Sequence, residues 1–181
     1  MSKIEMLVVC GAAGVGKTVT GFEVGHRLAE LDVAHAMIDS DELDRVHPWP
    51  PAGLGPGELS RRNLAALWGN FAGLGHTRLI VMGVFAELTA DLEWITAAVP
   101  GADVTAVRLT AGLPALAERI ERREIGSGAQ AQLARTTAQL AVIARSDPPG
   151  TLTLDTTAGT VGATAERILE VWPRGIHQPG G

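Results

Sequence analysis

The sequence lacks several features that mark whole classes of protein. Cys10 is the only cysteine among 181 residues, so an internal disulfide and a thiolate metal cluster are both excluded. The net charge is −5, without the basic excess of non-specific nucleic-acid binders, so we expect no nucleic-acid partner. No apolar run reaches 18 residues and Glu5 interrupts the first one, so we expect neither a membrane span nor a secretory signal. These absences predict a cytoplasmic protein.

Lysine is also scarce. Lys3 and Lys17 are the only two, whereas arginine supplies the other 13 positive charges. The length suits one domain, and a 46% share of apolar residues is enough for a sizeable core.

Short apolar runs alternate with helical patterns along the chain. The runs are rich in Val, Ile and Leu, as strands buried on both faces tend to be. The predicted strands are Ile4–Cys10, Val33–Asp39, Arg78–Gly83, Asp103–Leu109 and Thr151–Asp155. The predicted helices are Thr18–Leu31, Glu58–Gly73, Asp91–Ala98, Pro114–Glu124, Gln130–Arg145 and Ala163–Trp172. This alternation predicts a single three-layer α/β domain over residues 1–172, built on a five-stranded parallel sheet.

Three segments interrupt the alternation. The stretch PWPPAGLGPG (48–57) holds four prolines and three glycines, so it can be neither regular helix nor central strand. The stretch IGSGAQAQ (125–132) joins two helices with small residues, and we expect it to be mobile. Residues 173–181 are predicted to form a flexible tail.

One motif explains the internal lysine. GAAGVGKT (11–18) fits the pattern G-x-x-x-x-G-K-[ST], for which composition alone would give about 0.003 matches in this chain. Glycines let backbone N–H groups cradle phosphate oxygens, and the following helix turns its positive end toward the same anion. A lysine ammonium is a compact charge that reaches the β- and γ-phosphates, where a planar guanidinium fits less well. The predicted nucleotide ligands are Gly11, Ala12, Ala13, Gly14, Val15, Gly16, Lys17, Thr18 and Val19.

From its first strand to its last helix the chain resembles the small P-loop kinases. These include adenylate, shikimate, gluconate and adenylylsulfate kinases and chloramphenicol phosphotransferase. The resemblance implies the P-loop NTPase fold with a short lid, ATP and Mg²⁺ as cofactors, and Thr18 as a metal ligand. It also implies an acceptor-side region at 48–75 and a lid region at 119–135.

Two acids mark the end of the second predicted strand, in IDSDE (38–42): Asp39 is its last residue and Asp41 lies two residues on. Ligands of doubly wound sheets lie beyond the carboxyl ends of the strands, so Asp39 and Asp41 should lie near the phosphate loop. Kinases of the family carry a similar D-x-D here. The resemblance implies that Asp41 is the base that positions the acceptor and that Asp39 supports the metal, although the two roles could be exchanged. The alternative is a helix cap at Asp39 and a first-turn acid at Asp41.

The third predicted strand, RLIVMG, ends without the acid of an ordinary Walker B motif. Glu87 comes too late to replace it, which argues against a motor ATPase. Shikimate kinases resemble this chain in having glycine there. Gly83 is therefore a candidate for close contact with substrate, or simply part of a tight turn.

Arginines gather before the loop at 125–132. The pattern RIERR resembles the start of the lid in adenylate kinases, which implies that Arg119 stacks on adenine and Arg123 reaches the transferring phosphate. The alternative is a solvated helix with i,i+4 ion pairs. The stretch DTTAG (155–159) resembles the loop beside the adenine, which implicates Thr157, or it is only a turn.

Arg62 opens the helix after the proline-rich loop, where it either grips a polar or anionic acceptor or is surface charge. His47 is a further candidate contact. The sequence thus predicts an ATP-dependent kinase acting on a hydroxyl of a small molecule, as a monomer or homodimer. Two alternatives stay open. One is a toxin-like kinase of nucleosides, nucleotides or nucleotide sugars, and the other is a nucleotide-binding regulatory module without significant turnover.

Overall fold

A five-stranded parallel sheet forms the middle layer of the computed structural model, which describes residues 3–123, 128–143, 145 and 147–174. The strand order is β2-β3-β1-β4-β5, so the first strand lies at the centre, between β3 and β4. The strands are β1 (Ile4–Cys10), β2 (Ala36–Asp39), β3 (Arg78–Gly83), β4 (Ala102–Thr110) and β5 (Leu152–Asp155). All the pairings are parallel, with Cys10 opposite both Gly83 and Arg108. The predicted fold class is confirmed.

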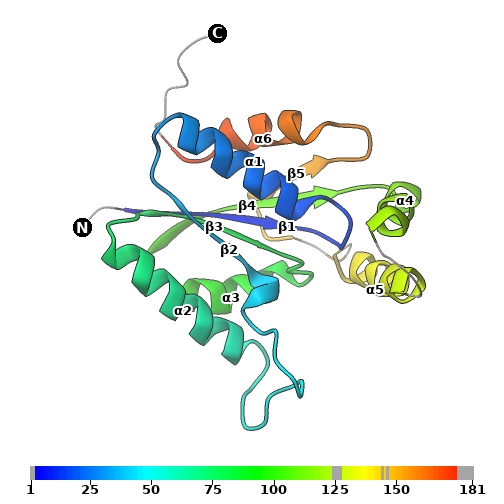
Figure 1. Cartoon of the computed structure of the whole chain (residues 1–181), viewed down its shortest axis with the longest axis horizontal. Coiled ribbons are helices and arrows are strands. Elements are labelled where there is room, and N and C mark those ends of the chain that lie inside the picture. The colour runs from blue at the N-terminus through cyan, green and yellow to red at the C-terminus, as the bar shows by residue number, and fades with distance from the viewer. Residues whose placement is uncertain (1–2, 124–127, 144, 146, 175–181) are drawn as a thin grey trace.

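Helices cover both faces of the sheet (Figure 1). On one face lie α1 (Lys17–Glu30) and α6 (Val161–Leu169), and on the other lie α2 (Glu58–Gly73) and α3 (Leu88–Ala98). The helices α4 (Leu113–Arg123) and α5 (Gly128–Ile143) lie side by side beyond the carboxyl end of β4. A single 3-10 turn, η1 (Ser40–Glu42), follows β2.

The core consists of two apolar layers, one on each face of the sheet. Successive strand residues point to opposite faces, and both sets are apolar here because both faces are covered. Met6 and Val8 of β1 contact the layer under α2 and α3, whereas Leu7 and Val9 contact the layer under α1 and α6. Burial on both faces holds β1 rigidly, and with it the loop that follows.

The predicted elements are all present: β1, β3 and α2 have the predicted bounds, and the others differ at one or both ends. The second strand starts at Ala36 rather than Val33, because the Val33 amide bonds to Leu28 O and its carbonyl accepts from the His35 ring. The last helix covers Val161–Leu169 rather than Ala163–Trp172, since the Thr160 hydroxyl caps it by accepting from the Ala163 amide. Among the described residues, no helix is both long and apolar enough to cross a bilayer.

Candidate active site

The loop between β1 and α1, which was predicted to bind phosphate, contains three glycines with positive φ, Gly11, Gly14 and Gly16. Gly16 has φ +97°, a left-handed conformation that glycine adopts without strain, and α1 begins at the next residue. The helix therefore points its unpaired N–H groups back into the loop. The Lys17 ammonium curls over the loop and donates to Ala12 O at 3.1 Å. These features agree with the phosphate loop predicted from GAAGVGKT, whose binding of phosphate stays a prediction.

Thr18 and Asp39 meet at the carboxyl edge of the sheet. The Thr18 hydroxyl donates to Asp39 Oδ2 at 3.1 Å, although the two residues are 21 apart in the chain. A hydroxyl and a carboxylate oxygen at this separation fit Mg²⁺, which takes oxygen ligands and completes its shell with water and substrate phosphates. No cluster of three or more His, Cys, Asp or Glu side chains suited to a metal occurs among the described residues, so such an ion would depend on nucleotide phosphates.

Asp39 also caps η1. Its Oδ1 accepts from the Asp41 amide at 3.1 Å, so the capping alternative holds for the same side chain that contacts Thr18. The cap fixes the start of η1 and turns Asp41 toward the cavity beside the phosphate loop. Residue Asp41 is exposed overall. Nevertheless, the pKa of its carboxyl group is raised above the usual value. Partial desolvation is the larger cause, and repulsion from the Asp39 carboxylate is the second.

A cavity of about 610 Å³ opens over the phosphate loop. Lys17, Thr18, Asp39 and Asp41 line it, so four residues predicted from two separate motifs face one space. Its cationic lining comes from four different segments, namely Lys17, Arg45, Arg119 and Arg135. Such a lining suits a polyphosphate, whose charge several cations can share.

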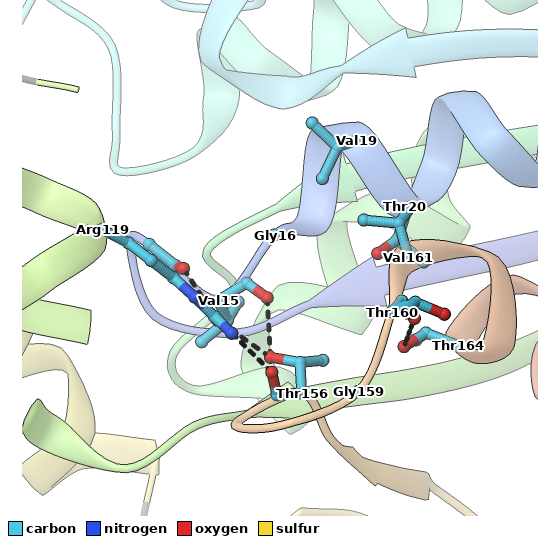
Figure 2. Close-up of a pocket in the computed structure, with 11 residues that line it drawn as sticks. Val15, Gly16, Val19, Thr20, Arg119, Thr156, Gly159, Thr160, Val161 and Thr164 are labelled. Atoms are coloured by element: carbon cyan, nitrogen blue, oxygen red, sulfur yellow. Dashed lines mark hydrogen bonds between the residues drawn. The ribbon is translucent and has the colours of Figure 1, made fainter. Parts of the chain in front are cut away.

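A second, narrower pocket of about 190 Å³ lies between the phosphate loop and the segment before α6. Its walls are largely small or apolar, including Val15, Val19 and Val161. Figure 2 shows Arg119 extending from α4 across this pocket to Thr156. Arg119 Nη1 donates to Gly14 O at 3.4 Å and to Thr156 Oγ1 at 3.2 Å, so this side chain bridges the loop and the β5–α6 segment. Arg119 is thus a shared wall of both spaces.

The helix α5 presents one face to the larger cavity. Gln132, Arg135 and Gln139 recur at helical spacing, and all three line the cavity. Gln139 Oε1 accepts from the Ala13 amide at 3.0 Å, which ties α5 to the phosphate loop. Arg135, Arg45 and Gln139 were not among the predicted site residues. Helix periodicity could have indicated Arg135 and Gln139, since they share a face with Gln132.

The predicted lid loop lies partly outside the described residues. Positions 124–127 and the side chain of Arg123 are among those not described, so the roles predicted for Arg123 and for the loop stay predictions. Arg122, at the end of the same helix, pairs with Glu118 at 2.6 Å on the surface. That pair agrees with the alternative of a solvated helix face at this position.

Three predicted contacts lie away from the cavities. Arg62 is an exposed residue whose guanidinium pairs with Glu58 at 2.6 Å, so the structure does not bring it to a binding space. Gly83 is buried, and a side chain there would collide with Ser40 Oγ and the Phe85 ring, so protein atoms fill the space expected for substrate. Thr157 bonds Asp155 and the Gly112 amide, which makes it part of a turn, whereas its neighbour Thr156 lines the narrow pocket.

A third cavity of about 270 Å³ adjoins the large one, and Asp41 and Val84 line both. It lies between the segment from β2 to α2 and the start of α3. Asp91 and Trp94 of α3 reach it, with Trp94 Nε1 donating to Asp91 Oδ1 at 3.2 Å. Burial raises the pKa of Asp91 above its usual value, because a desolvated carboxylate favours its neutral form. Neither residue was predicted, since nothing in the sequence distinguishes them from helix-surface residues.

Arg108, which was not predicted from the sequence, holds the part of the third cavity's wall that Val84 and Phe85 form. Arg108, at the end of β4, is 1% exposed and donates from Nη1 to Val84 O at 3.3 Å and from Nη2 to Phe85 O at 2.9 Å. Val84 O also accepts from the Gly11 amide at 3.2 Å. Phe85 has φ +39°, an uncommon conformation for a bulky residue, which these contacts help to hold.

No protein-family model and no curated protein matches the chain in sequence. Solved structures match it over nearly their full length. A tunicamycin resistance protein from Deinococcus radiodurans has a TM-score of 0.62 at 20% identity, over 93% of this chain and 95% of that one. The APS kinase of Mycobacterium tuberculosis, in complex with AMPPNP and APS, has a TM-score of 0.59 at 19% identity, over 94% and 98%. A gluconokinase from Sinorhizobium meliloti has a TM-score of 0.58 at 21% identity, over 94% and 96%. At these identities the likeness concerns the fold, and the fold of this chain is that of the small P-loop kinases.

Proposed function

We propose that this protein is an ATP- and Mg²⁺-dependent kinase that transfers the γ-phosphoryl group to a hydroxyl of a small molecule. The observation that carries the proposal is that Lys17, Thr18, Asp39 and Asp41 line one cavity, here called the phosphate cavity. It shares Arg119 with the narrow pocket and Asp41 with the third cavity, which is called the acidic cavity because Asp41, Asp44 and Asp91 line it. A module that only binds a nucleotide needs Lys17, Thr18 and Asp39. An acid beyond them, at the boundary with a separate cavity, suits a reaction with a second substrate.

Each residue has a definite task in this proposal. The narrow pocket holds the adenine ring of the nucleotide, and the loop amides and Lys17 hold its phosphates. Thr18 and Asp39 hold Mg²⁺. The metal neutralises charge on the β- and γ-phosphate oxygens when it is bound. Arg119 and Arg135 lie where they can share the charge of the transferring group.

The transfer step involves Asp41. Its carboxylate accepts the proton of the acceptor hydroxyl while the hydroxyl oxygen bonds to the γ-phosphorus. The bond from that phosphorus to the β–γ bridging oxygen breaks, and ADP leaves with the electron pair. An in-line arrangement requires nucleotide and acceptor on opposite sides of the γ-phosphate, which agrees with the positions of the narrow pocket and the acidic cavity.

A metabolite screen for acceptor-dependent ADP release tests the proposal, preceded by thermal shift with Mg-ATP. We expect a concentration-dependent rise in Tm with Mg-ATP, and turnover with a hydroxylated compound. Lack of binding to any nucleoside triphosphate would refute the proposal. Binding without turnover across a broad panel would favour the regulatory module instead.

A further inference from the structure

The cavity beside Asp41 is acidic. Asp41 and Asp44 come from the β2–α2 segment and Asp91 from α3, and no Lys, Arg or His is among the described residues that line the cavity. Arg62, which was expected near an acceptor, and its neighbour Arg61 both pair with Glu58, at 2.6 and 2.8 Å. An anionic acceptor would therefore meet like charge without a compensating partner.

Two of these carboxylates are oriented by neutral donors. The Ser60 hydroxyl donates to Asp44 Oδ2 at 3.2 Å, and the Trp94 indole donates to Asp91 Oδ1 at 3.2 Å. Among the ion pairs of the described residues, none includes Asp41, Asp44 or Asp91. An ionised carboxylate accepts several hydrogen bonds, so each retains capacity for a donor on the ligand.

Aromatic rings complete the cavity. Phe85 and Trp94 both line it and pack edge to face, with ring centroids 5.9 Å apart. Aromatic faces attract ammonium groups through the ring quadrupole, and more strongly where water is excluded. Phe85 is buried and Trp94 is half-buried, so the rings add a partly dry wall to the acidic one.

Size restricts the ligand further. The cavity is about 270 Å³, slightly below the range of about 300–1,000 Å³ typical of drug-sized ligands, so it suits a small metabolite. The buried Arg108, which bonds to the Val84 and Phe85 carbonyls of the wall, also donates to both carboxylate oxygens of Asp147. It therefore supports the cavity without offering an anion a partner inside it.

We propose that the phosphoryl acceptor is a small hydroxylated amine, bound as its ammonium ion by Asp44, Asp91 and the Trp94–Phe85 wall. The inference rests on the proposed kinase function, because it assigns the acidic cavity to the acceptor. The cavity and its aromatic wall define the site, and the carboxylates define its charge. The hydroxyl then faces Asp41 at the boundary with the phosphate cavity.

Three sugars that differ mainly in charge test the inference. Glucosamine, glucose and glucuronate carry a positive, a neutral and a negative group on similar rings. Binding of each is measured by calorimetry with Mg-AMPPNP present, and ADP release is measured with Mg-ATP, along with a panel of smaller amino alcohols. We expect the amines to bind and glucuronate not to bind. Equal binding of the three sugars, preference for glucuronate, or no binding by any amine in the panel would overturn the inference.

Matched variants locate the effect. Asp91→Asn keeps an oxygen for Trp94 while removing the charge, and Asp44→Asn does the same for Ser60. Each should weaken the best amine about 10- to 100-fold, mainly in KM, with KM for ATP unchanged. Glu93→Gln is the control, since Glu93 is exposed on the same helix and does not line this cavity. If Asp91→Asn and Asp44→Asn both bind the amine as wild type does, the site assignment is wrong.

The two proposals fail separately. Amine binding that depends on Asp91 without any ADP release would leave the cavity assignment standing and remove the kinase function. ADP release with a neutral or anionic acceptor would keep the kinase and remove the amine. Mg-ATP binding by thermal shift, measured without any acceptor, tells these cases apart from a misfolded preparation.

Discussion

Arg108 and Asp147 form a two-pronged ion pair that joins the end of β4 to the segment before β5. Arg108 Nε and Nη2 donate to the two carboxylate oxygens at 3.0 and 2.7 Å, across 39 residues of chain. The Arg108 side chain is 1% exposed and the Asp147 side chain 18%. The same guanidinium holds the Val84 and Phe85 carbonyls, so one buried cation connects three segments around the site.

Removing Asp147 should therefore destabilise the fold. Asp147→Ala leaves a buried guanidinium without its counter-ion, a change that typically costs about 3–5 kcal/mol, and partial exposure of Asp147 favours the lower end. Urea unfolding measures the change in free energy. Glu170→Ala is the control, because it breaks an exposed pair with Arg167 that should contribute about 0–1 kcal/mol. Equal effects of the two substitutions would show that burial of Arg108 carries no energetic consequence.

The two lysines provide a matched test of the phosphate loop. Lys17→Ala should lower kcat by about 10³-fold or more while the protein stays folded, because the ammonium stabilises charge that develops on the phosphate. Lys3→Ala should leave kcat unchanged, since Lys3 pairs with Asp103 on the surface. Steady-state kinetics and circular dichroism check both. Wild-type turnover by Lys17→Ala would contradict the assigned role.

Asp41 and Asp39 should separate chemistry from metal binding. Asp41→Asn removes the base, so kcat should fall about 10²- to 10⁴-fold with little change in ATP affinity. Asp39→Asn should raise the Mg²⁺ concentration needed for half-maximal rate, because Asp39 Oδ2 contacts the Thr18 hydroxyl. Rates across a Mg²⁺ titration, with ATP Kd, distinguish the two. The opposite pattern would invert the roles, and two unaffected variants would leave Asp39 as a helix cap only.

Arg135 offers a test of α5 in the reaction. Arg135→Ala should lower kcat by about 10²-fold, because this arginine lines the phosphate cavity and can share the charge of the transferring group. The control is Arg122→Ala, which removes an arginine paired with Glu118 on the surface of α4. Similar losses in both variants would indicate a general effect of positive charge rather than a contact at the site.

Cys10 should be unreactive in the folded protein. It is fully buried at the end of β1, where burial raises the pKa of its thiol to about 12. Only about one molecule in 10⁴ then carries the thiolate at pH 8, and the thiolate is the reactive form. Thiol titration should find no reaction in buffer and one equivalent in guanidinium chloride. Rapid labelling under native conditions would show that β1 opens readily.

Sequence patterns predicted β1 and β3 with their exact bounds, because these central strands are buried on both faces and therefore appear as continuous apolar runs. The phosphate loop could also be predicted from the sequence, since its proposed chemistry depends on neighbouring residues in one motif. The role of Arg108 could not be predicted, because an arginine within an apolar strand gives no sign of a partner 39 residues away. Arg62 was predicted as a candidate contact of the acceptor, but in the structure it pairs with Glu58, one helical turn earlier. The acidic cavity brings together three segments, and only the tertiary fold does that.

The separation of the narrow pocket from the acidic cavity has a consequence for engineering. The two spaces share no lining residue. One is built from the phosphate loop, Arg119 and the β5–α6 segment, and the other from the β2–α2 segment, Val84 with Phe85, and α3. Asp44, Asp91 and Trp94 line the acidic cavity and neither of the other two spaces, so exchanging these three side chains alters that cavity alone. Under the proposed function, the protein could acquire a new acceptor through these three positions without a change to the residues proposed to bind the nucleotide.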